Sequence, residues 1–139
     1  MKVENALEPT PAQLEAFIAG AKDRPIHMVN LLKFRTKAAY ADGRDAEMAG
    51  RDVYMFRYGL PMIELVQAAG GEMHFSGDAA SLLVGEVEDL WDTVAIVTYP
   101  SEAVMAEITQ SPKFQEISEH RKAGLEGQLL INCPAPDPS

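Results

Sequence analysis

Apolar residues in this chain gather into short extended segments that alternate with segments of helical periodicity. The clearest extended segment is 93–99, whose β-branched and aromatic residues favour a pleated backbone, and Pro100 ends it because proline has no N–H for a ladder. Residues 26–34 form a second clear strand after Pro25. Both strands carry apolar side chains on both faces, whereas a strand with one face in water alternates. Both faces of the predicted sheet must therefore be covered.

Two further strands have weaker patterns. Residues 72–77 and 82–86 are predicted to be the two halves of one bent strand, or one strand with a bulge around Gly77 and Asp78. Residues 127–132 form the last predicted strand. The pattern therefore predicts a sheet of four strands.

The helices are marked by their caps as well as by their periodicity. An N-terminal helix begins at Thr10, with proline in its first turn, and ends near Gly20. Residues 50–69 form a longer helix in which Pro61 is expected to cause a kink, since proline removes a backbone hydrogen bond and crowds the preceding turn. The remaining segments are two serine-capped helices and a long polar loop, at 101–110, 112–124 and 36–49.

The order of these elements defines a fold. After the extra N-terminal helix it is β-α-β-β-α-β, which predicts an α+β, ferredoxin-like domain with a four-stranded antiparallel sheet. Its helices cover one face only, so the apolar residues on the other face favour a homodimer whose sheets pack together, a dimeric α/β barrel. The expected organisation is an N-terminal helical extension over 1–25, the domain over 26–132 and a flexible proline-rich tail over 133–139.

Charge and composition argue against several classes of function. Acidic residues outnumber basic ones by 21 to 12, giving a net charge of −9, which argues against binding to nucleic acid or an anionic membrane. Apolar runs are too short for a membrane span or a secretion signal, so a cytoplasmic location is expected. The single Cys133 excludes an internal disulfide and a multi-cysteine metal site. Glycine motifs for nucleotide phosphates and the nucleophile-elbow motif are missing.

A set of short motifs, in a fixed order, resembles a known family. The motifs lie at 29–35, 39–40, 50–51, Tyr54, 58–59, 70–71, 85–86, 91–92, 99–101, 111–115 and 120–121. Over about residues 26–132 the chain resembles the longer form of family 1330 among the domains of unknown function, in the dimeric α/β-barrel superfamily. The resemblance implies the fold and the dimer but no reaction, since the superfamily includes cofactor-free monooxygenases, haem proteins of the chlorite-dismutase type, muconolactone isomerases and small-molecule binders. Phe114 replaces the tyrosine that is usual in such families, which excludes a role for that hydroxyl.

Arg121 is the sharpest chemical signal. It shares the buried stripe of its helix with Phe114 and Ile117, where an unpaired charge is costly. Its planar guanidinium suits a bound carboxylate or enolate, which makes it a candidate catalytic residue. The simpler interpretation is an internal ion pair with Asp92 or Glu86, or a bond to the last helix carbonyls.

His74 is the second candidate catalytic residue, because a histidine in a strand can act as a general base near neutral pH. A lone histidine is more often a packing or rim residue. His27 and His120 have weaker cases, and the three histidines have no metal-ligand spacing, so no metal site is predicted. No cofactor is predicted either, and a haem ligand has no positive support.

Five residues are candidates for ligand binding. Asn30, in mid-strand, either orients a ligand or links two subunits. Tyr54 and Tyr58 lie one helical turn apart and either offer hydroxyls to a pocket or pack as core aromatics. Trp91 either walls a pocket or seals the sheet edge, and Arg35, at the mouth of the long loop, is placed to attract an anion or to be solvated.

These residues lead to one functional expectation. The predicted protein is a homodimer that binds a small, partly apolar molecule with a carboxylate or carbonyl group, in a pocket between sheet and helices. If it is an enzyme, cofactor-independent proton transfer or oxygenation fits best, with His74 as base and Arg121 or Asn30 stabilising an oxyanion. The alternative is a non-catalytic dimerisation or small-molecule-sensing module, and the two differ in whether Asn30 and Arg121 line an open cavity or an intersubunit seam.

Overall fold

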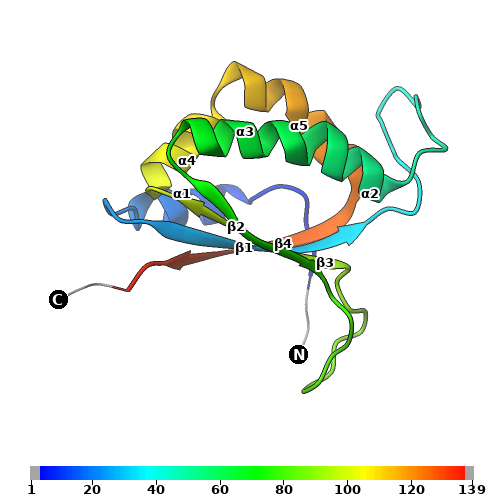
Figure 1. Ribbon diagram of the computed structural model, residues 1–139, viewed down its shortest axis with the longest axis horizontal. Helices are drawn as coiled ribbons and strands as arrows, with labels where there is room; N and C mark the ends of the chain where they lie inside the picture. The colour runs from blue at the N-terminus through cyan, green and yellow to red at the C-terminus, as the bar shows by residue number, and fades with distance from the viewer. Residues whose placement is uncertain (1–3, 137–139) are drawn as a thin grey trace.

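Four antiparallel strands form the sheet of this chain, and the helices lie on one side of it (Figure 1). The computed structural model describes residues 4–136. The strands follow the spatial order β2-β3-β1-β4, and each neighbouring pair is antiparallel. Their bounds are β1 (Ile26–Phe34), β2 (Glu72–Asp78), β3 (Thr93–Tyr99) and β4 (Leu125–Pro134).

Helices connect the strands in the predicted order. They are α1 (Pro11–Ala19), α2 (Gly50–Asp52), the π-helix η1 (Val53–Gly59), α3 (Leu60–Ala68), α4 (Glu102–Thr109) and α5 (Pro112–Gly124). Thr10 caps α1 with a capping box, in which its hydroxyl accepts from the Gln13 N–H and the Gln13 side chain accepts from the Thr10 N–H. Because α2, η1 and α3 form one continuous helical segment and α4 and α5 follow β3, the predicted α+β ferredoxin-like fold is confirmed.

The distortion expected at Pro61 takes the form of a change in helical winding. Pro61 lies in the first turn of α3, directly after seven π-helical residues. The N–H of Leu60 reaches back to the carbonyl of Met55, five residues away, as in a π-turn. This wider winding relieves the crowding that a proline ring imposes on the preceding α-turn.

Two details of the predicted strands are wrong. Residues 82–86 are not the second half of a strand, because β2 ends at Asp78 and the chain then leaves the sheet as a loop. Gly85 has a φ angle of 91°, which residues of an extended strand do not adopt. The loop also has no neighbouring strand with which its backbone could form hydrogen bonds. The register shift in β2 falls between Met73 and Phe75 and not near Gly77.

The last strand is longer than predicted, because β4 pairs with β1 from Leu125 to Pro134. Cys133 and Pro134 therefore belong to the sheet, and the N–H of Ala135 donates to the carbonyl of Pro25. Residues 137–139 of the predicted tail lie outside the described residues.

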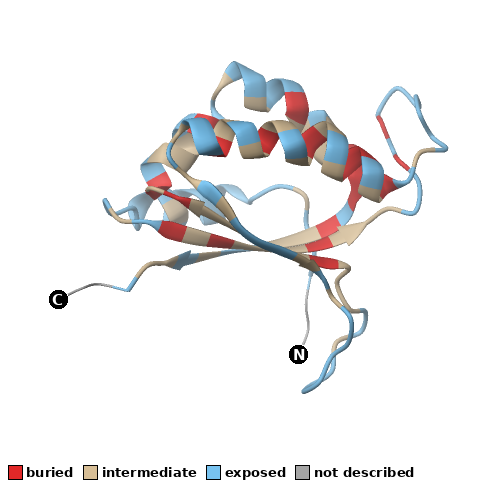
Figure 2. Cartoon of the chain, viewed as in Figure 1, coloured by how far each residue is buried: buried red, intermediate tan, exposed pale blue. Residues whose placement is uncertain are grey.

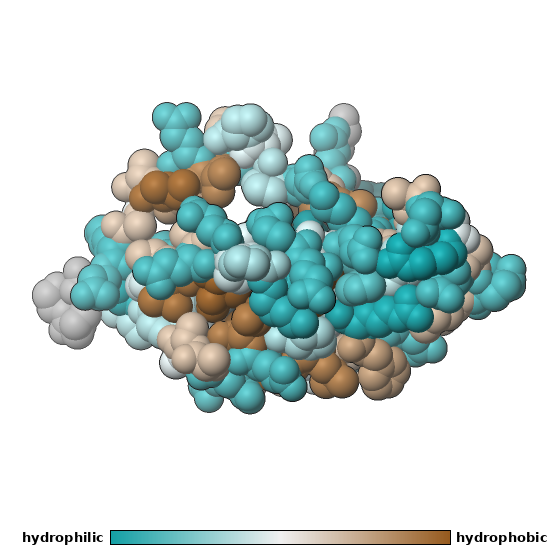
Figure 3. Space-filling view, turned by 90° about the horizontal axis from the view of Figure 1, so that it is seen from above, coloured by the Kyte–Doolittle hydropathy of each residue, from teal (hydrophilic) through white to brown (hydrophobic). Residues whose placement is uncertain are grey.

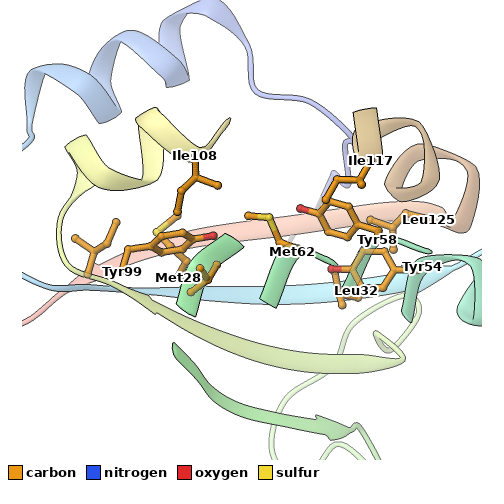
Figure 4. Packing of buried hydrophobic residues seen from close by; sticks show 11 residues of the cluster. Met28, Leu32, Tyr54, Tyr58, Met62, Tyr99, Ile108, Ile117 and Leu125 are labelled. Carbon is orange, nitrogen blue, oxygen red and sulfur yellow. The ribbon is translucent and has the colours of Figure 1, made fainter. Parts of the chain in front are cut away.

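The main core lies between the sheet and the helices. Figure 2 shows the buried positions of the strands facing those of the helices, and Figure 4 shows how their side chains interlock. The fully buried residues Ile26, Leu32 and Val66 are part of this cluster. Seen from above, the helical side of the molecule is largely hydrophilic, with a few apolar patches (Figure 3).

The other face of the sheet has no layer of helices over it within residues 4–136 (Figure 1). Side chains alternate between the two faces of a strand, so the neighbours of the buried residues of β1 point to this open face. Phe75 and Ile131 on it are 52% and 46% exposed. The apolar residues of the open face are Val29, Leu31, Phe75, Val94, Ile96, Leu129 and Ile131.

Two glycines let the backbones of α2, α5 and the end of β1 approach closely. Gly50 at the start of α2 donates its N–H to the carbonyl of Arg35, and Arg35 donates its own N–H to the carbonyl of Gly124 at the end of α5. A Cβ atom on Gly124 would lie 2.6 Å from the carbonyl oxygen of Gly50 and 2.9 Å from the backbone nitrogen of Tyr54. This contact fixes the helix that carries Tyr54 against the end of β1.

Substitution of Gly124 by alanine is therefore expected to destabilise the chain. The new methyl group would meet backbone atoms that cannot move independently, so Gly124→Ala should lower the free energy of unfolding by about 1–3 kcal/mol. Gly59→Ala is the control, because its Cβ meets only an ordinary contact at 3.4 Å, and a helical alanine should stabilise by about 0.5–1 kcal/mol. Urea denaturation measures both, and equal effects would contradict the tight contact.

The polar loop 36–49 is held to the helices by Tyr40. Its hydroxyl accepts from Nη1 of Arg57 at 3.0 Å and lies 2.6 Å from Nδ1 of His120. Burial lowers the pKa of His120, the nearby Glu119 opposes this, and the charges of Arg57 and Arg44 add to the lowering. The Nδ1 atom of a neutral His120 ring can then accept a hydrogen bond from the hydroxyl of Tyr40.

The stability of the chain should depend on pH through His120. Because the folded pKa of His120 lies below its ordinary value of 6.5, the unfolded chain takes up this proton first on acidification. The contribution of neutral His120 to the free energy of unfolding is thus complete above pH 6.5. It is lost as the pH falls below this value. In His120→Gln the fall in the free energy of unfolding that is due to His120 should disappear. The fall that is due to protonation of carboxylates should remain. Urea titrations between neutral and mildly acidic pH measure the difference, and parallel curves would contradict it.

Candidate functional site

Arg121 lies in the last turn of α5, half-buried between the helix and the sheet. Its Nη1 donates to Oε1 of Gln128 at 2.9 Å, and its Nη2 donates to the carbonyl oxygen of Leu7 at 2.6 Å. The ion pair expected with Asp92 or Glu86 is not present, so that interpretation is wrong. Both partners of Arg121 are neutral acceptors.

A chain of hydrogen bonds runs from Arg121 into the middle of the sheet. Nε2 of Gln128 donates to Oδ1 of Asn30 at 2.8 Å, and Nδ2 of Asn30 donates to the carbonyls of Met28 and Ala95, each at 3.2 Å. A guanidinium can only donate, so it turns the oxygen of Gln128 toward itself. The amide nitrogen of Gln128 then faces Asn30 and fixes the orientation of that amide too.

Three buried tyrosines lie above this chain of hydrogen bonds, and Tyr54 and Tyr58 pack with ring centroids 5.2 Å apart. Burial raises the pKa of Tyr54, Tyr58 and Tyr99, and the positive charge of Arg121 partly opposes this at Tyr54 and Tyr58. None of the three hydroxyls has a hydrogen-bond partner within residues 4–136. Figure 4 shows those of Tyr58 and Tyr99 pointing toward Met62 from opposite sides. Each remains a protonated donor at physiological pH.

These residues form one site, which we call the inner polar cluster: Asn30, Tyr54, Tyr58, Tyr99, Arg121 and Gln128. Asn132 lies nearby on the same face of β4, opposite Met28, and its Oδ1 is buried without a hydrogen-bond partner among the described residues. Sequence analysis missed Gln128 and Tyr99. Gln128 was visible as the polar residue that shares a strand face with apolar neighbours, and Tyr99 as the aromatic end of the clearest strand.

Arg35 and Trp91 lie elsewhere, in an open cleft of about 570 Å³ at the end of the sheet. The cleft also contains Arg51, which pairs with Asp78 at 2.9 Å. Nε of Arg35 is buried and has no hydrogen-bond partner among residues 4–136. The Trp91 indole donates to Oδ1 of Asn5 at 3.1 Å, so it both walls this cleft and holds the N-terminal segment.

His74 is on the open face of the sheet. Its ring centroid lies 6.1 Å from that of His27, whose Nδ1 is 2.8 Å from Oγ1 of Thr98. Arg121 is on the helical face, so the structure does not bring the two candidate catalytic residues together in one chain. Met73 pairs with Val97 on the helical face, so strand alternation points its neighbour His74 to the open face.

The described part of the chain offers no candidate metal site. It holds no group of three or more histidine, cysteine, aspartate or glutamate side chains placed to bind a metal ion. None of the described helices is long and apolar enough to cross a membrane. The cytoplasmic location stays a prediction.

The fold and the inner polar cluster define a class: a ferredoxin-like α+β domain with a polar site between its sheet and its helices. The chain belongs to the DUF1330 family, a domain of unknown function, whose family model matches residues 46–132. This confirms the resemblance seen in the sequence. No curated protein matches the chain.

Two crystal structures of the RPA0582 protein, described as a protein of unknown function from Rhodopseudomonas palustris, are similar to this chain. The methylated form is 33% identical over 96% of this chain and 97% of its own, with a TM-score of 0.87. The other is 32% identical over 97% and 100%, with a TM-score of 0.86. A hydroxynitrile lyase from Passiflora edulis is 15% identical over 84% and 97%, with a TM-score of 0.57, which shows a shared fold alone.

The unpartnered hydroxyls have a measurable consequence. Tyr58→Phe removes a buried group that has no partner among the described residues, so the free energy of unfolding should stay unchanged or rise by up to about 1 kcal/mol. Tyr40→Phe is the matched control, because it deletes a hydroxyl bonded to Arg57 and His120 and should cost about 1–2 kcal/mol. Thermal and urea unfolding measure both. An equal loss in the two variants would show that the Tyr58 hydroxyl has a partner.

Proposed function

We propose that this protein is a homodimer that binds a small, partly apolar organic molecule carrying a carboxylate or carbonyl group at the inner polar cluster. The observation that carries the proposal is the state of Arg121. A guanidinium has five N–H donors, and here two hydrogen bonds to neutral oxygens are formed. Glu8 forms its ion pair with Lys122, which is the main reason why the pKa of Glu8 is lowered. The charge of Arg121 adds to this lowering only from a distance. Arg121 therefore keeps donors and its positive charge for an anionic group.

The buried tyrosines support the same ligand. Protonated phenols that lack acceptors can donate to a carboxylate or carbonyl oxygen next to Arg121, as the donors of an oxyanion site do. The aromatic rings and Met62 around them supply apolar walls. The orphan carbonyl oxygen of Asn132 adds an acceptor for a hydroxyl or amine on the ligand.

The cluster favours binding over catalysis. It contains donors and a positive charge, but none of its members accepts a proton near neutral pH, because its amides do not titrate and burial keeps its phenols protonated. His74, the expected base, lies on the other face of the sheet. The hydroxynitrile lyase shares only the fold, so its activity does not extend to this chain.

The homodimer follows from the open face of the sheet. Its seven apolar side chains would be removed from water if a second copy placed the same face against it, about 10 Å away, as stacked sheets pack. Such a contact is isologous and closes on itself. His27 and His74 would then lie in the interface.

The alternative function is a dimerisation module without a ligand. The bond between Arg121 and the carbonyl of Leu7 favours it, because the cluster would then serve to hold the N-terminal segment on the sheet. The two functions differ in how the chain responds to small carboxylates.

A carboxylate panel separates them. Benzoate and phenylacetate should raise the melting temperature of the parent chain, and the uncharged benzamide should raise it less. In Arg121→Gln the affinity for benzoate, measured by calorimetry, should fall about 10–100-fold because a charge-assisted hydrogen bond is lost. Lys122→Gln is the matched control, since it removes a neighbouring charge from the exposed side of α5 and should leave the affinity unchanged. The absence of any shift, or equal affinities in both variants, would overturn the proposed ligand.

A further inference from the structure

The loop between β2 and β3 ends in an apolar tip. Residues 79–90, which we call the arm, leave the sheet after Asp78 and return before β3. At its tip Leu82, Leu83 and Val84 are 45%, 94% and 83% exposed. Three consecutive exposed apolar residues are rare on a monomer and indicate a contact surface.

The arm is fixed at its base and directed toward the open face. The N–H of Ala79 donates to the carbonyl of Asp92 at 2.9 Å, which closes the base of the arm. Lys33, which shares the open face with Leu31, donates to the carbonyl of Leu90 at 3.0 Å and pairs with Asp89 at 3.0 Å. Figure 1 shows the arm hanging below the sheet, on the side opposite to the helices. Whatever packs on the open face must meet the arm.

The length of the arm suits a second copy of the chain. Leu83 is five residues beyond the end of β2, so an extended arm reaches up to ~16 Å from the sheet. Stacked sheets lie ~10 Å apart. An arm of this length can therefore extend past the plane of a second sheet packed on the open face and reach its flank.

The charge of the arm points to the same occupant. Each chain carries a net charge of −9, so two copies need an apolar contact to overcome their repulsion. The tip is uncharged, and the acidic residues Glu86, Glu88 and Asp89 all follow it on the returning side. An apolar tip next to an apolar sheet face is self-complementary, which a two-fold contact between identical chains requires.

We propose that the arm is a clamp by which each copy of this chain grips the flank of the sheet of the other copy, with Leu83 and Val84 as the buried contacts. The clamp rests on the proposed homodimer and adds to it a second contact, separate from the sheet face. The partner is another copy of this chain.

Sedimentation over a micromolar concentration series tests the clamp. The parent chain should be a dimer, and Leu83→Asp/Val84→Asp should weaken the dimer by about tenfold or more, with an unchanged circular dichroism spectrum. The milder Leu83→Ser/Val84→Ser guards against a folding defect and should weaken it less. Leu60→Asp is the matched control, since Leu60 is 54% exposed on the helical side and its substitution should leave the dimer intact.

The other outcomes separate the two proposals. A parent chain that stays a monomer overturns the homodimer and the clamp together. A dimer of equal strength in the parent and in Leu83→Asp/Val84→Asp overturns the clamp alone. A photo-reactive benzoylphenylalanine at position 83 should crosslink to the sheet of a second copy. A crosslink to α3 or α5, or to a different protein, overturns the assigned position of the tip.

Discussion

A sheet with apolar side chains on both faces needs a cover on each, and this chain supplies helices for one face only. The covered face holds Ile26, Met28 and Leu32 among the buried residues of the core. The uncovered face leaves Phe75 and Ile131 about half exposed. The polar site therefore lies beneath the helices, and the face proposed for association lies on the other side of the sheet.

The inner polar cluster places polar groups among the apolar residues of the covered face. Amides shielded from water need their hydrogen bonds, and the half-buried Asn30 forms them with Gln128 and the strand carbonyls. Arg121 sets the direction of this chain of bonds, since it can only donate. The tyrosine hydroxyls above it have no hydrogen-bond partner within residues 4–136, so their donors are unused. A ligand that accepts hydrogen bonds would use them.

Local patterns in the sequence predicted most of the fold. The strands β1 and β3, the caps at Thr10 and Ser101 and the helix after Gly50 each depend on neighbouring residues, and all were found. Residues 82–86 were misassigned because strand formation requires a partner strand, and the propensities of Leu83 and Val84 do not show that none is available.

The candidate site depended on contacts between distant residues, so the sequence predicted it only in part. Helical spacing placed Arg121 correctly toward the sheet, but the partner it finds, the carbonyl of Leu7, is 114 residues away and is a backbone group. His74 was assigned to the same site as Arg121 because the alternation within 72–77 does not show which face of the strand meets the helices. Tyr54 and Tyr58 were recognised from their spacing, whereas their lack of partners is visible only in three dimensions.

The two faces of the sheet share one strand, and this links the site to the association surface. Asn30 of β1 faces the inner polar cluster, while Val29 and Leu31 on either side of it face away from the helices. A ligand that drew Gln128 away from Asn30 would remove the hydrogen bond to the amide oxygen of Asn30, while its bonds to the carbonyls of Met28 and Ala95 would remain. The proposed binding site and the proposed association surface therefore lie on opposite sides of a single strand.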